Sequence, residues 1–274
     1  MTIYNFIKKF YRAIRFFFLP KNVKLAELNR FNYPELDSRV LSYQLPSNKV
    51  SNNKVIYTCI TGGYDNLIIP SYYNCGWEYI CYTDNSELLK EKQKGPWIIK
   101  PLAYSEGSNA INNRWHKFHP HVLFPHYTES IYIDGNLDIL DDFLFKEIND
   151  KIDQKLLIPV HFKNDCIYKE IKCVKRSKKA KKEQLCAIRK LLKDNLFPEH
   201  YGLTENNIIY RKHNDELIIS IMEEWWDLLK IVPRDQLSLS YVLWKHGIII
   251  SDIKLSNARI NIGHYHFYYS DNHC

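Results

Sequence analysis

The sequence predicts an α/β fold with a largely parallel sheet, in which strands alternate with helices. Short apolar runs rich in Val, Ile and Tyr recur along the chain, and segments with apolar residues at helical spacing separate them. The 274 residues are 45 % hydrophobic, which is ample for the core of one large domain or two small ones. Only 9 glycines are present, so neither a repeat protein nor a low-complexity protein is indicated.

Residues 1–53 are expected to form a basic and aromatic helix with a connector, ahead of a main domain over residues 54–274. The opening MTIYNFIKKFYRAIRFFFLP carries charges that interrupt any apolar span of the ~20 residues that a membrane-crossing helix needs. No small-residue cleavage site follows, so a signal peptide is not expected. Such a helix suits a membrane interface, and the alternative is a helix packed on the protein's own body. Prolines and a polar cluster mark residues 20–54 as the connector.

Seven short runs predict strands, because they combine β-branched and aromatic residues with turn residues at their ends. The predicted strands cover residues 55–60, 79–83, 97–99, 130–133, 157–162, 207–210 and 248–250.

Two helices are predicted in the last third of the chain from apolar residues at helical spacing. The first covers residues 217–229, with Asn214 or Asp215 as its N-cap. The second covers residues 237–244 and ends at Gly247, in the position that favours a left-handed backbone.

The segment 172–193 carries ten basic residues against one acid, Glu183, in a chain of net charge +7. Leu185, Ile188 and Leu192 recur at helical spacing, which predicts an amphipathic helix with a very basic exposed side. Such a run fits an anionic partner, which could be phosphate, an acidic glycan, nucleic acid or a lipid surface. The alternative is an ordinary solvated helix face.

Polar residues follow three of the predicted strands, at positions 61–65, 83–84 and 134–138. Ligands of parallel α/β folds bind at the carboxyl ends of the strands. We therefore expect these three strand ends to converge on one crevice.

The strand at 130–133 runs directly into Asp134-Gly135-Asn136-Leu137-Asp138. A carboxylate at the end of a buried strand needs a partner, which could be a lysine, a helix terminus or a metal ion. A calcium-binding helix-loop-helix is excluded, because Ile139 and Phe145 stand where that loop needs Gly and Glu. Asp134 and Asn136 are two residues apart and should point the same way, as oxygen ligands of a hard divalent cation.

Several ordered motifs between about residues 54 and 266 resemble the TOD/MUCI-type glycosyltransferase-like family, which has plant and bacterial surface-polysaccharide members. The motifs are ITGGYDNL, WEYICYTDN, GPWIIKPL, NRWHKFHPH, SIYIDGNLDI, GLTENNIIYR and RDQLSLSYVLWKHG. The resemblance implies a single domain with a GT-A-like Rossmann-type fold, its mostly parallel sheet flanked by helices. It also implies a nucleotide-sugar donor and a divalent metal, Mn²⁺ or Mg²⁺, held by an Asp-x-Asp-like motif. Asn136 takes the second acidic position, so a lower metal affinity is expected.

The resemblance further implies a set of site residues. These are, for the metal, Asp134, Asn136, His264 and His266; for the nucleotide sugar, Thr61, Tyr64, Asp65, Thr83, Asp84, Arg114, Lys117, Glu205, Asn206 and Asn207; and for catalysis, Asp235 and Gln236.

Several of these residues have a structural alternative. Asp235 would bind a sugar hydroxyl beside Gln236 near the anomeric carbon, or else serve as the N-cap of the helix after Pro233. Arg114 would clamp a phosphate with Lys117, or else form a surface ion pair. The two C-terminal histidines would be exposed tail residues if they bind no metal.

The expected function is glycosyl transfer from a nucleotide-diphosphate sugar, a UDP-sugar, to a surface-polysaccharide or lipid-linked glycan acceptor. The reaction is expected to be metal-assisted and, by analogy, retaining. Seven cysteines without a CxxC pair indicate a reducing, cytoplasmic setting. We expect the enzyme to lie at the anionic inner membrane face and not to bind nucleic acid.

Two other classes of function compete with glycosyl transfer. A metallohydrolase could use His116, His119, His121 and His126, but prolines break the helix on which paired histidine ligands would sit. The other is a non-catalytic module that binds an acidic polymer through residues 172–193, which would not need three polar strand ends.

Overall fold

The computed structural model describes residues 17–18, 53–259 and 266–269. The predicted N-terminal helix and connector lie almost wholly outside the described residues, as does His264. No helix among the described residues is long and apolar enough to cross a membrane.

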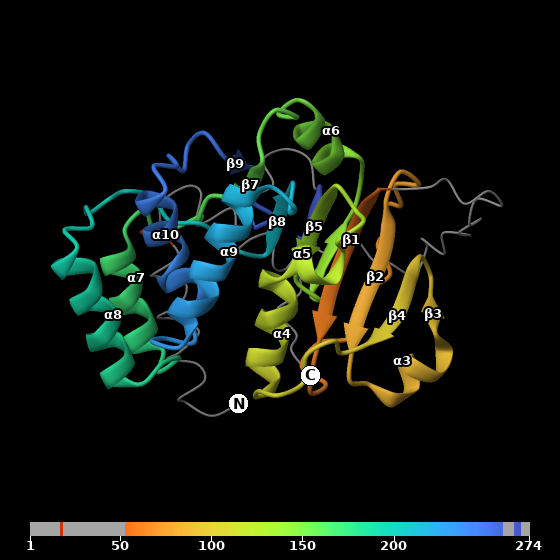
Figure 1. The fold of residues 1–274 in the computed structure, drawn as a ribbon, viewed down its shortest axis with the longest axis horizontal. Coiled ribbons are helices and arrows are strands. Elements are labelled where there is room, and N and C mark those ends of the chain that lie inside the picture. The colour runs from red at the N-terminus through yellow and green to blue at the C-terminus, as the bar shows by residue number, and fades with distance from the viewer. Residues whose placement is uncertain (1–16, 19–52, 260–265, 270–274) are drawn as a thin grey trace.

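The main sheet has eight strands in the order β3-β4-β2-β1-β5-β8-β7-β9 (Figure 1). Their bounds are β1 Lys54–Ile60, β2 Glu78–Thr83, β3 Gln93–Lys94, β4 Trp97–Pro101, β5 Glu129–Ile133, β7 Leu156–Pro159, β8 Ile208–Arg211 and β9 Lys254–Leu255. The neighbours β4, β2, β1 and β5 are parallel, whereas β3 and β8 run antiparallel to the strands they pair with. A second sheet pairs β6 Leu137–Ile139 with β10 Phe267–Tyr269.

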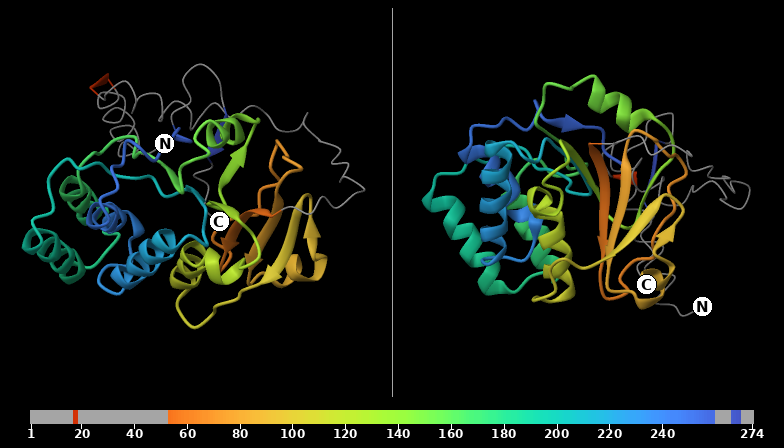
Figure 2. Two further views of the ribbon diagram at one scale, coloured as in Figure 1. Left: turned by 45° about the horizontal axis from the view of Figure 1, so that its top comes forward. Right: turned by 45° about the vertical axis from the view of Figure 1, so that its right-hand side comes forward.

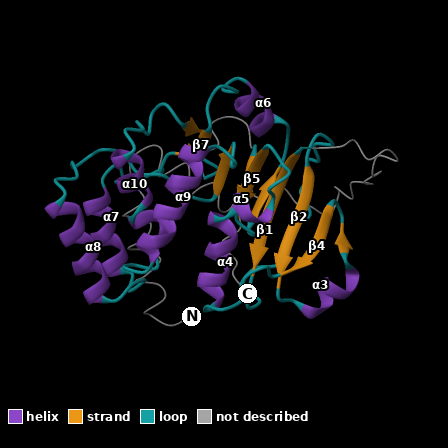
Figure 3. Ribbon diagram, in the orientation of Figure 1, coloured by secondary structure: helices purple, strands orange, loops and turns teal. Residues whose placement is uncertain are grey.

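Helices flank the sheet on both faces (Figure 3). They are α3 Ser86–Glu91, α4 Asn109–Phe118, α5 Pro120–Leu123, α6 Phe143–Asn149, α7 Ile167–Arg176, α8 Lys182–Asp194, α9 Glu216–Leu229 and α10 Leu239–Lys245, with the 3-10 helix η2 at Asp235–Leu237. Helices α7 and α8 lie side by side at the end of the molecule away from β4 (Figures 1 and 2).

The core divides according to the two-residue period of the central strand. Val55, Tyr57 and Cys59 of β1 pack in one cluster, and the alternate residues Ile56 and Ile60 pack in another on the opposite face. Both faces are covered, which is why the strand reads as a continuous apolar run. A third cluster fills the space between α7, α8 and α10.

The predicted strands at 55–60, 79–83, 97–99, 130–133, 157–162 and 207–210 are confirmed, with shifted ends. The helices over 217–229 and 237–244 are also confirmed, as α9 and as η2 with α10. Asp215 caps α9 by accepting a hydrogen bond from the Leu217 backbone N–H at 3.1 Å. The basic amphipathic helix is α8, whose Leu185, Ile188 and Leu192 are buried.

The prediction of a strand at residues 248–250 is wrong. Gly247 has φ +69°, and its N–H donates to the Trp244 carbonyl while the Ile248 N–H donates to the Leu243 carbonyl. These two bonds are the Schellman termination of α10, which uses the apolar residue after the glycine to close the helix. The strand that pairs with β7 begins later, at Lys254.

Candidate active site

A cleft of ≈ 530 Å³ opens at one edge of the main sheet. Residues that follow β1 and β5 line it, as expected for the carboxyl ends of parallel strands. Residues 205–207 line it as well, because β8 is antiparallel and therefore begins at the edge where β5 ends. The Asp134 N–H donates to the Asn207 carbonyl at 2.9 Å and joins these two segments.

One face of α4 forms a wall of the cleft. Asn109, Ala110, Asn113, Arg114 and Lys117 all line it, and their spacing places them on one side of a helix. The Asn113 side chain donates to the Cys59 carbonyl at 2.5 Å, which attaches this face to the end of β1.

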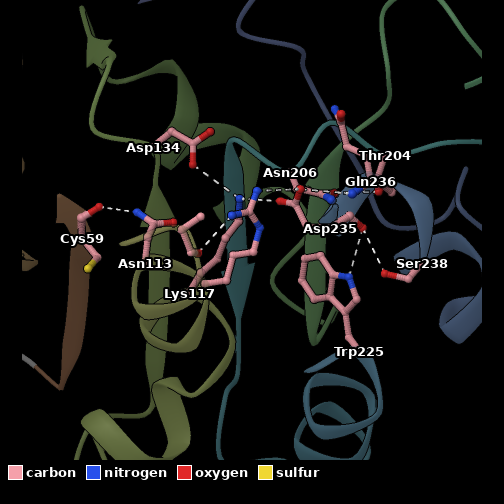
Figure 4. Close-up of polar contacts among 12 residues, drawn as sticks. Cys59, Asn113, Lys117, Asp134, Thr204, Asn206, Trp225, Asp235, Gln236 and Ser238 are labelled. Carbon is pink, nitrogen blue, oxygen red and sulfur yellow. Dashed lines mark hydrogen bonds and ion pairs between the residues drawn. The ribbon is translucent and has the colours of Figure 1, made fainter. Parts of the chain in front are cut away.

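Lys117 is the partner of the carboxylate at the end of β5. Its Nζ lies 3.4 Å from Asp134 Oδ1 and 3.0 Å from Asp235 Oδ2 (Figure 4). The Lys117 side chain is 5 % exposed, whereas that of Asp134 is 32 % exposed at the mouth of the cleft. The sequence favoured a divalent metal over a lysine as the partner of this carboxylate, but among the described residues it is a lysine that lies within ion-pair distance.

Asp235 is a buried carboxylate that stays ionised. Burial alone would raise its pKa, but the charges of Lys117, Arg114 and Arg234 outweigh burial and hold the pKa below its ordinary value. Arg114 Nη2 lies 4.0 Å from Asp235 Oδ1. The Asp235 carbonyl accepts a hydrogen bond from Trp225 Nε1 at 3.1 Å, which holds the backbone in place.

The N-cap alternative for Asp235 does not match its place in the structure. Arg234 occupies the N-cap position of η2, and Asp235 is the first residue of that helix. The Asp235 carboxylate accepts a hydrogen bond from Lys117 Nζ, and Asp235 and Gln236 both line the cleft. Both residues that the resemblance implies for catalysis therefore line the cleft.

The segment Glu205-Asn206-Asn207 carries buried polar atoms into the cleft. Arg259 Nε donates to Glu205 Oε1 at 3.0 Å, but Oε2 has no hydrogen-bond partner among the described residues. Burial raises the pKa of Glu205, although Arg259 opposes the shift. The side-chain amide of Asn207 likewise has no partner for either its nitrogen or its oxygen within the described part of the chain. Such groups are costly to bury and are satisfied when a polar ligand binds.

Asp134 and Asn136 both line the cleft, and their oxygens suit a hard divalent cation. Asp138, the third polar residue of the motif, is turned away and accepts hydrogen bonds from the backbone N–H and the hydroxyl of Ser71, both at 2.7 Å. Within the described residues, the one group of three His, Cys, Asp or Glu ligands lies elsewhere. These two oxygens would fit a divalent cation only with further ligands from other groups.

His266 does not line the cleft. Its Nδ1 lies 2.6 Å from Asp141 Oδ2, and its ring stacks on Phe143 with 3.8 Å between ring centroids.

The residues expected to bind the base and ribose are only partly brought together. Thr61, Tyr64 and Asp65 line the cleft, and Tyr64 is largely exposed there. Asp84 does not line the cleft, and its two carboxylate oxygens accept the Gly62 N–H at 3.0 and 2.9 Å. Thr83 is also outside the lining and accepts the Asn85 N–H.

Gly62 explains why this turn can approach α4. Its φ is +63°, and a Cβ there would come within 1.8 Å of the Asn109 side chain. The glycine turn therefore serves the close packing of two walls of the cleft.

Among the lining residues that sequence reasoning missed are five with amide or basic side chains: Asn109, Asn113, Lys179, Arg234 and Arg259. Asn109 and Asn113 could have been found from the spacing of polar residues before Lys117. Arg234 directly precedes Asp235, and Lys179 belongs to the basic segment 172–193. No local signal marked Arg259.

The histidines of the hydrolase alternative do not form a metal site in the described residues. Both ring nitrogens of His116 are hydrogen-bonded, to the Asn112 carbonyl and the Ala103 N–H, and burial lowers its pKa to about 4. His121 Nε2 pairs with Glu223 at 3.0 Å. These contacts are those of structural histidines.

Comparison with protein families identifies the chain. The family model of the TOD1/MUCI70 glycosyltransferase-like domain matches residues 47–254. The chain belongs to this family. It is therefore a glycosyltransferase, and the predicted α/β fold class, with a mostly parallel sheet flanked by helices, is confirmed. A comparison with curated proteins finds no match.

Among solved structures, the chain is similar to mouse xyloside xylosyltransferase 1, with 11 % identity and a TM-score of 0.44 over 80 % of this chain and 97 % of that one. It is also similar to the mannosyltransferase Ktr4p of S. cerevisiae, with 10 % identity and a TM-score of 0.40 over 81 % of this chain and 74 % of that one. A third similar structure is 4-diphosphocytidyl-2C-methyl-D-erythritol synthase of Anaerococcus prevotii, with 14 % identity and a TM-score of 0.40 over 76 % of this chain and 90 % of that one. At these identities and TM-scores, the similarities carry no information about substrate.

Proposed function

We propose that this glycosyltransferase moves a hexose from a UDP-sugar to a surface-polysaccharide or lipid-linked glycan acceptor, with retention of configuration. The observation that supports the proposal is the meeting of Asp134, Lys117 and Asp235 in a cleft with unsatisfied polar side chains. Such a cleft offers charge for a diphosphate and hydrogen bonds for a sugar in one place.

The donor's diphosphate would lie between α4 and the Asp134–Asn136 turn. Arg114 and Lys117 would bind phosphate oxygens, and Asp134 with Asn136 would hold a divalent metal that completes its ligand shell with the same oxygens. When bound, the metal neutralises charge that develops on the leaving diphosphate. Tyr64 offers an exposed ring on which the base can stack.

The sugar would lie over Asp235 and Gln236. Asp235 is charged and rigidly held, so it can accept hydrogen bonds from sugar hydroxyls without losing its place. The unsatisfied amide of Asn207 and the carboxylate of Glu205 would complete this pocket.

In the transfer itself, the bond between the anomeric carbon and the diphosphate oxygen breaks, and UDP leaves with the electron pair. The acceptor hydroxyl oxygen forms the new bond on the same face of the sugar, and its proton passes to the departing phosphate oxygen. Gln236 would lie beside the anomeric carbon and stabilise positive charge through its carbonyl dipole.

Titration calorimetry of UDP with and without Mn²⁺, on wild type and Asp134→Ala, tests the donor site. We expect Mn²⁺ to tighten UDP binding to wild type and to have little effect on the variant. Equal affinity in all four conditions would falsify the metal assignment. Melting curves with a panel of UDP-, GDP- and CMP-sugars identify the nucleotide, and stabilisation by GDP- or CMP-sugars alone would contradict the choice of UDP.

We also propose that the enzyme is cytoplasmic and lies at the inner membrane face, near lipid-linked acceptors. The basic helix near residues 175–193 would hold it there together with residues 3–19, which lie almost wholly outside the described residues. The ten basic residues of segment 172–193 are all exposed on or between α7 and α8. Each basic residue near an anionic lipid surface is worth ~1 kcal/mol. Flotation of the full chain with anionic liposomes at low salt tests this, with Lys182→Glu/Lys190→Glu as the comparison. A wild type that stays in the soluble fraction contradicts it.

A further inference from the structure

A second group of ligand-type side chains lies away from the cleft, where the loop before α7 meets the loop that leads to β8. Cys166, Glu199 and His200 each offer one ligand atom, and these three atoms lie within 4.8 Å of one another. None of the three residues lines the cleft. The two loops are joined by a hydrogen bond from the Gly202 N–H to the Asp165 carbonyl at 2.9 Å.

The three donors are a thiol, an imidazole and a carboxylate, which together are typical of zinc and not of Mg²⁺ or Mn²⁺. Cys166 is the N-cap residue of α7, but its thiol makes no capping hydrogen bond. Cys166 as a residue is 2 % exposed, whereas Glu199 and His200 are exposed to solvent. A metal could therefore enter from the exposed side and meet the buried sulfur.

His200 is held in the way that metal-binding histidines are held. Its Nδ1 lies 2.5 Å from Asp165 Oδ2, and a ring that donates Nδ1–H to a carboxylate keeps the lone pair of Nε2 for a metal. The backbone of His200 has φ +61°, an unfavourable value for a residue with a side chain. The chain thus keeps a strained conformation at the residue that would bind the metal.

We propose that Cys166, Glu199 and His200 bind one Zn²⁺, with water as the fourth ligand and Asp165 orienting the histidine. The ion would fasten the start of α7 to the segment that enters the cleft. Shortly after His200, the Leu203 carbonyl accepts the His161 N–H at 2.8 Å, and the Glu205 N–H donates to the Pro159 carbonyl at 2.7 Å. Zinc, although bound outside the active site, would therefore stabilise the chain segment that leads from His200 to Glu205.

The test uses the full chain, freed of metal with a chelator and titrated with Zn²⁺ by calorimetry and with Co²⁺ by absorption. We expect one Zn²⁺ per chain, a thiolate-to-cobalt charge-transfer band and a higher melting temperature with zinc. Cys166→Ser should abolish the band, and His200→Ala should weaken zinc binding at least tenfold. Asp165→Asn should weaken it about tenfold, as expected for a residue that orients a ligand.

Cys186→Ser is the matched control, because Cys186 is an exposed thiol on α8 outside this group. It should bind zinc and show the cobalt band as wild type does. The proposal is overturned if wild type takes up no stoichiometric zinc, or if His200→Ala and Cys166→Ser bind it as wild type does. Should Cys166→Ser fail to fold, His200→Ala decides the matter, because its side chain is about half exposed.

Discussion

Lys117 and Asp235 are 118 positions apart in the sequence and form a buried ion pair, with Nζ 3.0 Å from Oδ2. The backbone of Lys117 is fixed from behind, because its carbonyl accepts hydrogen bonds from Arg211 Nη1 at 2.7 Å and from the Tyr57 hydroxyl at 3.1 Å. The Lys117 ammonium group also lies over the ring of Tyr132, with 4.9 Å from Nζ to the ring centroid, and this contact further restrains the side chain. The core thus sets the position of the charge that the cleft presents.

Lys117→Met should destabilise the protein by about 3 kcal/mol, because it leaves Asp235 buried with only the more distant arginines as partners. The double variant Lys117→Met/Asp235→Leu should recover most of this loss while remaining inactive. Urea denaturation of both variants measures the free energy of unfolding. The prediction is contradicted if the double variant is less stable than the single one.

Gln236→Ala and Asp235→Asn should lower turnover strongly and leave UDP affinity nearly unchanged. Both residues are placed at the proposed sugar position and not at the phosphates, so their contacts are made mainly in the transition state. Steady-state kinetics and UDP calorimetry separate the two effects. A low melting temperature for Asp235→Asn with activity intact would point to a structural role instead.

Asn207→Leu should raise stability by about 1 kcal/mol and weaken donor binding, because it removes a buried amide that has no partner among the described residues. Asn206→Leu is the matched contrast. Its Oδ1 accepts the Thr204 hydroxyl at 2.7 Å, so that substitution should destabilise. Thermal unfolding and the KM for donor check both effects. A loss of stability in Asn207→Leu equal to that in Asn206→Leu would be the contrary result.

Acidification should destabilise the native state between about pH 6.5 and 4. Burial lowers the pKa of His116, His161 and His213 to about 4, from an ordinary value of 6.5. Within this window the unfolded chain binds protons that the native state does not, so the free energy of unfolding falls as pH falls, by at most ~3 kcal/mol for each histidine. Urea denaturation at pH 7.5 and 4.5 measures the loss, and His116→Gln should reduce it. Equal stability at both pH values would refute this origin.

Local sequence signals were sufficient for six of the seven predicted strands and for the helix ends at Asp215 and Gly247. The central strand is recognisable because residues 55–60 are apolar on both faces, and Asp215 and Gly247 mark helix ends through their own backbone and side-chain geometry. The motif after β5 was also visible, because polar residues at a strand end stand out against an apolar run. The apolar residues 248–250 were wrongly predicted as a strand because an apolar residue is also used in the termination of a helix, and the local sequence does not distinguish the two.

The sequence by itself determined the α/β class, the family motifs and two of the strand ends that line the cleft, whereas the third predicted strand end, at residues 83–84, does not line it. Only the tertiary structure decided that Lys117 lies against Asp134 and Asp235, that Asp138 turns away to Ser71, and that Asn207 is left without a partner within the described residues. Strand and helix formation depend on neighbours within a few residues, which the sequence lists directly. The partner of a charge depends on which distant segments pack together, and that is settled only when the core excludes water and brings residues 117 and 235 to one place.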